Sequence, residues 1–322
     1  MMKKTRFSNH FQSAALAIAM LTCTALSACS SGSASSGSTA TTASTTAAQT
    51  TQATETTAAA TAEIPPASET TTAGTTVSTD SPITLTVFAA ASMTETLTEI
   101  SELYHAEHPN TEIIFNFDSS GTLKTQIEEG AVCDIFISAA EKQMNQLDVT
   151  ASEDINPNHL DFVDTDTRFN LVENKVVLAI PDGNPADITS WSDIGTDKCR
   201  MIALGNEDVP VGSYSIEILE SLGILDSLTS SNKITYGSNV KEVTTQVKEA
   251  AVDCGIIYAT DAYSAGLSTV DTATADMCRQ VIYPAAVLKG SAYKEEAAAF
   301  LEFLKTPQAV EIFESVGFSM AE

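Results

Sequence analysis

Apolar residues recur along the chain with two different periods, and these periods predict an alternation of strands and helices. Ile83 to Ala90 alternates apolar and polar residues and then becomes fully apolar, which predicts a strand. Met93 to His105 repeats apolar residues every three or four positions, which predicts an amphipathic helix. Further strands are predicted at 111–117, 134–138, 175–180, 201–204, 234–236 and 255–258, and further helices at 122–129, 212–222, 240–251, 292–304 and 308–316.

Strands that alternate with helices predict an α/β fold, in which helices cover both faces of parallel sheets. The region from Ile83 to Glu322 is long enough for a real core and for two lobes with a ligand cleft between them. We place residues 83–169 and 284–322 in the first lobe and residues 170–283 in the second.

The first 28 residues have the features of a secretory signal. A basic head with Lys3, Lys4 and Arg6 precedes an apolar run at 14–26 that is too short to span a membrane. No later apolar run is long enough to span one either. We therefore predict residues 1–28 to be a signal peptide.

The signal ends in Leu26-Ser27-Ala28-Cys29, which matches the processing box of lipoproteins. In such a box the cysteine is acylated and becomes the new N-terminus, so Cys29 is the predicted lipidation site. Cys23 is a poorer candidate, because the residues before it suit the peptidase less well. An ordinary signal peptide with an incidental cysteine is the alternative.

Residues 29–82 have the composition of a linker. Beyond the cysteine they are almost entirely Ser, Thr, Ala, Gly and Gln and contain no Lys or Arg. Such a segment has too few large apolar groups to offset its ordering entropy. We predict a disordered tether between the lipid and the folded region, and a glycosylated stalk remains an alternative.

The charge balance excludes some classes of function. The chain has 16 basic and 42 acidic residues, and loss of the signal leaves 13 basic residues and a net charge of −29. A protein this acidic does not bind nucleic acid. It also repels small anions at long range, so an anion site in it must rely on local dipoles and hydrogen bonds instead of a basic patch.

The four cysteines beyond Cys29 form no recognisable metal or redox motif, because none of them makes a C-x-x-C pair. Cys133 and Cys254 open apolar strands and are predicted to be buried thiols. A disulfide between Cys199 and Cys278 is an open possibility if the protein lies outside the cytoplasm.

Four predicted helices begin directly after a strand with small or hydroxyl residues. At the first start, Ser92 and Glu95 have capping-box spacing. At the last, Asn239 can cap the helix. The four starts are 89–95, 118–122, 209–214 and 237–242. Helix N-termini at the carboxyl ends of strands present free N–H groups to a ligand crevice. The pattern indicates an oxyanion site that needs no Lys or Arg, although plain helix caps would look the same.

These segments strongly resemble the molybdate-binding proteins of ABC transporters, and the likeness extends over residues 83–322. The similar motifs are Val87-Phe88-Ala89-Ala90-Ala91-Ser92-Met93-Thr94, Phe117-Asp118-Ser119-Ser120-Gly121-Thr122-Leu123, Asp134-Ile135-Phe136-Ile137-Ser138-Ala139, Val209-Pro210-Val211-Gly212-Ser213-Tyr214, Asn239-Val240, Gly255-Ile256-Ile257-Tyr258-Ala259, Tyr283-Pro284 and the ending through Gly317-Phe318.

The resemblance implies a two-lobed periplasmic-binding-protein-like fold of type II that closes on its ligand. It also implies that Ser92 and Ser120 bind the oxyanion through hydroxyl and backbone N–H. Val211 and Val240 each donate a backbone N–H, and Tyr258 donates its hydroxyl. The ligand would be molybdate or tungstate, held without any cofactor and without side chains that coordinate a metal cation. The implied partner is the membrane permease of an ABC importer, and the protein is expected to act as a monomer.

All five implied contacts are donors, which suits a fully deprotonated dianion. Asp118 raises a doubt, because a carboxylate in the cleft would repel a dianion or accept the proton of a phosphate; we expect it to point outward. Lys124 and Lys241 lie near two of the helix starts, but a solvated helix face explains them equally well.

The interpretation as a binding protein and not an enzyme leaves three alternatives open. A receptor for sulfate or phosphate is the nearest. A lipoprotein hydrolase that uses Ser92 or Ser120 is weaker, because neither serine lies in a G-x-S-x-G elbow. An adhesive surface lipoprotein has only the predicted tether in its favour.

Overall fold

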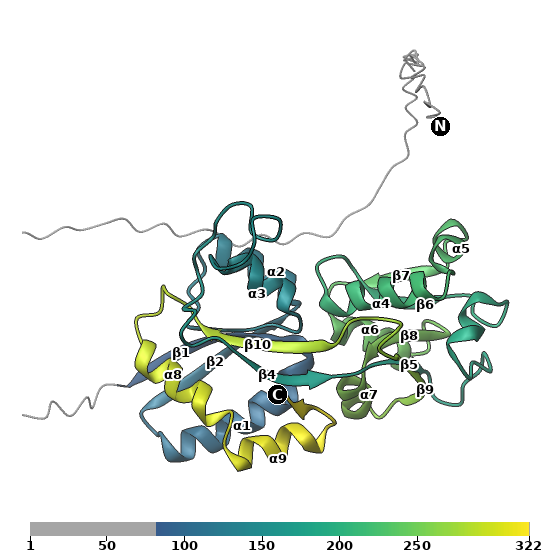
Figure 1. Ribbon diagram of the computed structural model, residues 1–322. Coiled ribbons are helices and arrows are strands. Elements are labelled where there is room, and N and C mark those ends of the chain that lie inside the picture. The colour runs from purple at the N-terminus through teal and green to yellow at the C-terminus, as the bar shows by residue number, and fades with distance from the viewer. Residues whose placement is uncertain (1–81, 322) are drawn as a thin grey trace, which may run out of the picture. The chain divides into compact units, whose positions relative to one another are not determined.

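A computed structural model describes residues 82–321 (Figure 1). The predicted signal peptide, the lipidation site Cys29 and nearly all of the predicted tether lie outside the described residues. No helix among the described residues is both long and apolar enough to cross a membrane.

The first lobe contains a six-stranded sheet with the order β11-β4-β10-β3-β1-β2. Its strands are β1 (Ile83–Ala90), β2 (Thr111–Asp118), β3 (Ile135–Ile137), β4 (Phe169–Asn174), β10 (Val281–Val287) and β11 (Ser319–Met320). β1 runs parallel to β2 and β3, whereas β10 runs antiparallel to β3 and β4. The sheet is therefore mixed and not purely parallel as predicted.

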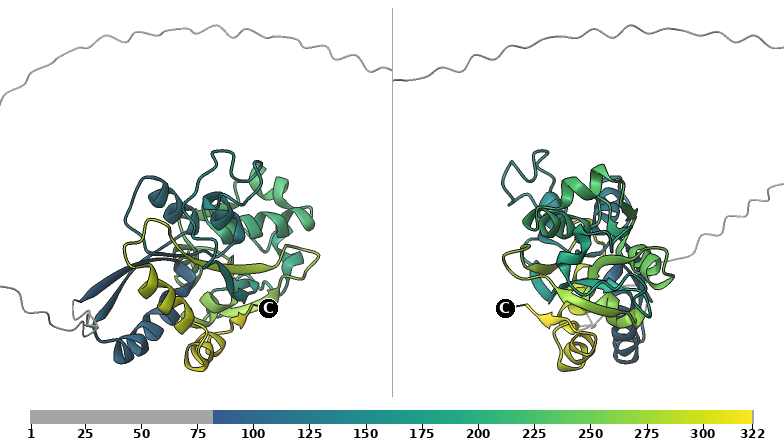
Figure 2. Two further views of the ribbon diagram at one scale, coloured as in Figure 1. Left: turned by 60° about the vertical axis from the view of Figure 1, so that its left-hand side comes forward. Right: turned by 90° about the vertical axis from the view of Figure 1, so that its right-hand side faces the viewer.

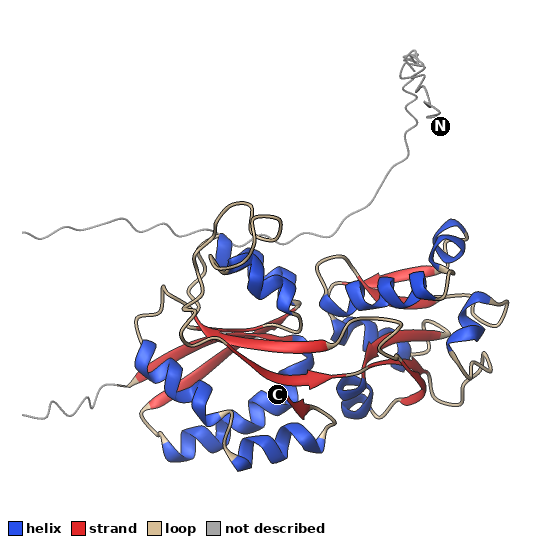
Figure 3. Cartoon of the chain, in the orientation of Figure 1, coloured by secondary structure: helices blue, strands red, loops and turns tan. Residues whose placement is uncertain are grey.

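Helices cover both faces of this sheet (Figure 3). One face carries α2 (Ser120–Glu128) and α3 (Glu141–Leu147), and the other carries α1 (Thr94–Glu107), α8 (Lys294–Phe303) and α9 (Pro307–Ser315). α9 packs against α1, so the end of the chain returns to the start of the lobe (Figure 2).

The second lobe contains a five-stranded sheet with the order β7-β6-β8-β5-β9. Its strands are β5 (Val176–Ile180), β6 (Ile202–Gly205), β7 (Ile234–Gly237), β8 (Cys254–Tyr258) and β9 (Ser268–Thr272), and its helices are α4 (Pro210–Ser221), α5 (Leu225–Ser230), α6 (Val240–Lys248) and α7 (Ala259–Ala265). Two short 3-10 helices complete the elements, η1 (Ala91–Met93) and η2 (Trp191–Gly195).

Two segments of chain connect the lobes. Only Lys175 separates β4 of the first sheet from β5 of the second, and residues 273–280 lead from β9 back to β10. By sheet membership the lobes divide a few residues away from the predicted boundaries at 169/170 and 283/284, because β4 and β10, which the sequence pattern did not predict, both belong to the first sheet. The larger apolar core runs through both lobes.

The four cysteines among residues 82–321 are free thiols. Cys133 and Cys254 are buried, as predicted. Cys199 lies beside Cys254, with 3.8 Å between the two Sγ atoms, and is not bonded to Cys278. The possible Cys199–Cys278 disulfide is therefore not present, because Cys199 packs at the start of β6 against β8.

Asp253 fixes the start of β6 beside the start of β8. Its carboxylate accepts hydrogen bonds from the backbone N–H groups of Arg200 (2.7 Å) and Met201 (3.0 Å) and from the Arg200 guanidinium (2.8 Å). Burial acts to raise the pKa of Asp253, but these hydrogen bonds outweigh it and lower the pKa.

We expect Asp253→Asn to lower the free energy of unfolding at pH 7 by about 1–3 kcal/mol, because one amide oxygen cannot replace both carboxylate oxygens. A lowered folded-state pKa gives stability that is present above the unfolded pKa, about 3.9, and is lost as the pH falls through the folded value. The difference in free energy of unfolding between the wild-type protein and Asp253→Asn should therefore be smaller at about pH 3 than at pH 7. Urea unfolding at both pH values measures it, with the exposed Asp197→Asn as control. An equal difference at both pH values would contradict the charge argument.

Candidate functional site

A small cavity lies where helix starts from both lobes meet the ends of β1 and β8. It is lined by Ala90, Ala91, Ser92, Asp118, Ser119, Ser120, Ala139, Val209, Pro210, Val240 and Tyr258. Four of the five predicted site residues are in this set. Val211, the fifth, is fully buried and follows Pro210 in the first turn of α4.

Ser92 reaches the cavity by a route that the sequence did not predict. The chain forms the 3-10 turn η1 between β1 and α1, and no side chain caps either helix. The predicted capping box of Ser92 and Glu95 is therefore wrong. The turn directs Ser92 into the interior, where its hydroxyl lies 2.9 Å from the hydroxyl of Tyr283.

Two consecutive serines at the start of α2 have different tasks. Ser119 is the N-cap, and its Oγ accepts a hydrogen bond from the backbone N–H of Thr122 (3.1 Å). Ser120 is thereby placed at the first helical position and is fully buried. Its Oγ accepts a hydrogen bond from the backbone N–H of Ala139 (2.9 Å), which leaves the hydroxyl proton of Ser120 free to donate.

Three backbone N–H groups at the site have no partner within their helices. Ser120, Val211 and Val240 lie in the first turns of α2, α4 and α6, where the helix supplies no acceptor. Among residues 82–321 no acceptor elsewhere in the chain takes these N–H groups. First-turn N–H groups combine with the positive end of the helix dipole to favour an anion.

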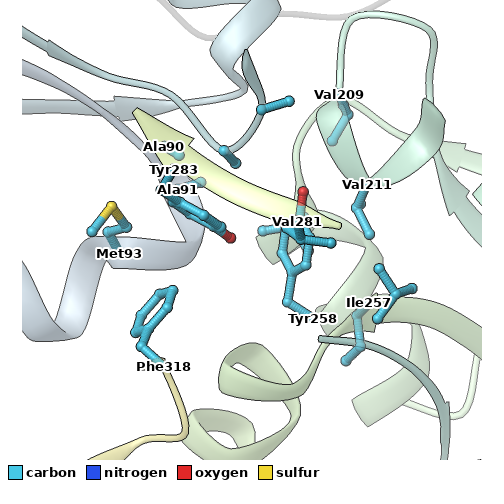
Figure 4. Close-up of a cluster of buried hydrophobic side chains, with 14 of the residues drawn as sticks. Ala90, Ala91, Met93, Val209, Val211, Ile257, Tyr258, Val281, Tyr283 and Phe318 are labelled. Carbon is cyan, nitrogen blue, oxygen red and sulfur yellow. The ribbon is translucent and has the colours of Figure 1, made fainter. Parts of the chain in front are cut away.

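Tyr258 adds a hydroxyl at the end of β8. The residue is 1% exposed, and its hydroxyl has no hydrogen-bond partner among the described residues. Burial raises the pKa of Tyr258 well above its ordinary value, so the group keeps its proton. Figure 4 shows Tyr258 next to Tyr283, whose ring lies edge-on at 5.9 Å between centroids. A buried hydroxyl without a hydrogen-bond partner lowers stability unless a ligand supplies the acceptor.

The Asp118 carboxylate does not point away from the cleft as expected. The residue lines the cavity, and its Oδ1 accepts hydrogen bonds from the backbone N–H of Ser119 (2.7 Å) and from Nδ2 of Asn239 (3.3 Å). Asn239 caps α6 as predicted, since its Oδ1 accepts from the N–H of Glu242 at 3.0 Å. One hydrogen bond of this capping residue thus joins the two lobes.

A second contact between the lobes explains Gly121. Its backbone N–H donates to the carbonyl oxygen of Asp208 at 3.0 Å. A Cβ added at Gly121 would lie 2.2 Å from that oxygen, which is far inside van der Waals contact. Only glycine permits this approach of the lobes beside the cavity.

The third contact involves Lys241, directly after Val240. Its ammonium lies 2.7 and 2.8 Å from the two carboxylate oxygens of Glu95 in the first lobe and 3.2 Å from Asp261 in its own lobe. Burial raises the pKa of Asp261 to about 6, against the opposing effect of Lys241. Lys241 is therefore not on a solvated face, whereas Lys124 pairs with Glu128 one turn along α2 (2.8 Å).

The site offers hydrogen-bond donors and no cation. None of the residues that line the cavity is Lys, Arg or His. Among residues 82–321 no group of three or more His, Cys, Asp or Glu side chains is placed to hold a metal ion. Neither serine has a histidine or lysine among its hydrogen-bond partners in this part of the chain. The arrangement can enclose a small anion, because donors from both lobes converge on one cavity.

Sequence reasoning gave no role to Asn174 or Thr260 and quoted Tyr283 only as part of a motif, although all three lie next to the site. Asn174 Nδ2 donates to Thr260 Oγ1 (2.9 Å) and to the hydroxyl of Tyr283 (3.1 Å). Asn174 ends a strand that was not predicted, so its position could not be recognised. The dipeptide Tyr283-Pro284 was the only signal, since a proline inside a strand marks an irregularity, and the register of β10 shifts there.

Comparison with known proteins agrees with this geometry. Residues 85–319 match the family described as bacterial extracellular solute-binding protein. The chain is 37% identical over 246 residues to a Bacillus subtilis protein named as an ABC transporter substrate-binding lipoprotein, covering 75% of this chain and 89% of that protein. It is 34% identical over 243 residues to the molybdate-binding protein ModA of Haemophilus influenzae, covering 73% and 89%.

Among solved structures, the periplasmic molybdate-binding protein of Azotobacter vinelandii superposes with a TM-score of 0.64 at 25% identity, over 74% of this chain and all of that chain. The sequence matches and this superposition cover the region that contains both sheets and the cavity. The chain belongs to the bacterial extracellular solute-binding proteins and, within them, to the ModA-type molybdate-binding proteins of ABC transporters.

Proposed function

We propose that this chain captures molybdate or tungstate outside the cytoplasm and delivers it to the membrane permease of an ABC importer. The observation that carries the proposal is the buried hydroxyl of Tyr258, which lacks a partner and borders a cavity formed by unpaired N–H groups. These donors can form hydrogen bonds to a ligand that has several acceptor oxygens. The names of the related proteins identify molybdate as the first ligand to test.

The balance of charge supports a ligand held by neutral donors. The chain has a formal net charge of −26, so its long-range field repels anions. Hydrogen bonds to a charged group contribute roughly 1.5–3 kcal/mol each. Two serine hydroxyls, one tyrosine hydroxyl and several N–H groups can together outweigh the repulsion. A fully deprotonated dianion suits them best, because it needs no acceptor from the protein.

Phosphate is the second candidate, and Asp118 is the observation that favours it. Its carboxylate lines the cavity and could accept the proton of hydrogen phosphate. However, Oδ1 of Asp118 already accepts two hydrogen bonds, from Ser119 and Asn239. Only Oδ2 of this carboxylate is therefore left to accept a hydrogen bond from such a proton. Sulfate has the charge of molybdate and a smaller size, so it is the third anion to test.

The proposal places the protein on the outer face of the cell membrane as a monomer anchored by lipid at Cys29. The basic head, the apolar run and the box before Cys29 support the anchor. A relative named as a lipoprotein supports it as well. The predicted tether, residues 29–82, would let the binding lobes reach the permease. No catalytic role is proposed, since neither serine at the cavity is hydrogen-bonded to a base.

Calorimetric titration of the purified full-length protein tests the ligand. We expect one site per chain for molybdate and tungstate, with weaker binding of sulfate and phosphate. Saturating molybdate should also raise the melting temperature, because it binds only the folded state. Clear heat with phosphate and none with molybdate would contradict the proposed ligand.

Tyr258→Phe removes only the hydroxyl that has no partner. We expect molybdate affinity to fall about 10–100-fold, the effect of losing one hydrogen bond to a charged group. The melting temperature of the ligand-free protein should not fall, because no protein hydrogen bond is lost. Tyr104→Phe is the matched control, since Tyr104 is buried in α1 away from the cavity. Unchanged affinity in Tyr258→Phe would show that this hydroxyl does not touch the anion.

Cys29→Ser tests the lipid anchor. We expect the variant to lose incorporation of labelled palmitate and to leave the membrane fraction, because no acyl chain remains to partition into the bilayer. Cys23→Ser serves as control and should keep both properties. Palmitate that persists in Cys29→Ser would place the modification elsewhere.

A further inference from the structure

The hydrogen bonds behind Ser92 form a chain that crosses between the lobes. Ser92 Oγ lies 2.9 Å from the Tyr283 hydroxyl, and Asn174 Nδ2 lies 3.1 Å from the same hydroxyl and 2.9 Å from Oγ1 of Thr260. Tyr283 is on β10, Asn174 ends β4, and Thr260 is in α7 of the second lobe. All four residues are buried.

The orientation of the Asn174 amide follows from its backbone neighbour. The N–H of Lys175 donates to Oδ1 of Asn174 at 2.8 Å, and an N–H can only donate. The amide oxygen is thereby located, and the NH₂ group must face Tyr283 and Thr260. Asn174 Nδ2 has two hydrogens and no acceptor capacity, so it donates one to each.

The orientation of the Tyr283 hydroxyl follows in turn. Its oxygen accepts from Asn174, and among residues 82–321 its one other hydrogen-bond partner is Ser92 Oγ. If Ser92 donated to Tyr283, the Tyr283 proton would be buried without an acceptor. If Tyr283 donates to Ser92, the proton of Ser92 is free for a ligand in the cavity. Only the second arrangement satisfies every group once an anion is bound.

The hydroxyl of Ser120 is oriented in the same way, but by a single hydrogen bond. Its Oγ accepts from the N–H of Ala139 at 2.9 Å, and this N–H has a single proton with a fixed direction. The lone pairs of both serines are thus turned toward protein donors. Both hydroxyl protons are then available to a ligand in the cavity.

We propose that Tyr283 and Asn174 are positioning residues that hold the Ser92 hydroxyl as a donor toward the bound oxyanion. This assignment rests on the proposed function, because the direction of the Ser92 proton matters only if an anion occupies the cavity. Neither residue lines the cavity, and both act through Ser92. Asn174 ends β4, just before the chain passes from the first sheet to the second.

A double-mutant cycle between Ser92→Ala and Tyr283→Phe tests the assignment by molybdate titration. Phe keeps the ring that packs edge-on against Phe318 at 5.4 Å between centroids. We expect Ser92→Ala to weaken binding about tenfold and Tyr283→Phe about fivefold. The double variant should bind within about twofold of Ser92→Ala alone, because the Ser92 hydroxyl that Tyr283 would orient is already absent. A merely structural role for Tyr283 would make the two losses multiply.

Two further measurements keep the outcomes separate. Tyr104→Phe, the same change at a buried tyrosine away from the cavity, should leave molybdate affinity unchanged. Asn174→Asp offers a second route if Tyr283→Phe folds poorly. A carboxylate accepts the Tyr283 proton, so Ser92 must donate to Tyr283 and molybdate binding should weaken at least fivefold.

Multiplying losses in the cycle, with intact wild-type binding, would overturn this assignment alone. Absence of molybdate binding by the wild-type protein would overturn the proposed function and this assignment together.

Discussion

A small anion at this site can be held only by neutral donors, and much of the structure around the cavity is explained by this constraint. The cavity has no Lys, Arg or His in its lining, and the chain has a formal net charge of −26. A neutral donor is effective only at hydrogen-bond distance and only when its direction is fixed. Buried helix starts meet both conditions, because their first-turn N–H groups are rigid and have no partner in the helix. The fold brings three such starts and the end of β8 to one point.

Donors at short range also require that the two lobes lie close together, and three of the interlobe contacts lie beside a donor. Gly121, which approaches Asp208 through its backbone, follows Ser120. Asn239, which bonds to Asp118, precedes Val240, and Lys241, which bonds to Glu95, follows it. The contacts that join the lobes and the proposed ligand donors therefore lie on neighbouring residues. The glycine is needed for this reason, since any side chain at position 121 would hold the lobes apart where the donors must converge.

The parts of this structure that could be predicted are those encoded locally. Asn239 caps its helix because its neighbours along the chain supply the N–H group, and the amphipathic period of residues 93–105 marks a helix without tertiary information. Ser92 lines the cavity, as the resemblance implied, but it turns inward at η1 and does not cap α1 as its spacing to Glu95 predicted. Asp118 and Lys241 were misjudged because their partners Asn239 and Glu95 are more than 100 residues away, with sequence separations of 121 and 146. β4 and β11 lack a clear hydrophobic period, since they pair in the mixed part of the sheet. The roles of Asn174 and Tyr283 depend on that pairing, so they could not be predicted.

A site shared in this way between lobes is suited to release as well as to capture. Ser92 and Ser120 belong to the first lobe, and Val211, Val240 and Tyr258 to the second. Neither lobe alone supplies all five of these residues, so the full set of contacts to an anion requires both lobes. A lysine or arginine at the cavity would keep the anion on one lobe after opening, because an ion pair acts over a longer range than a hydrogen bond. Lys241, the nearest interlobe cation, is neutralised by Glu95 and Asp261 and so leaves no positive charge to retain the ligand. Neutral donors divided between two lobes are therefore compatible with the solute-binding role of this family.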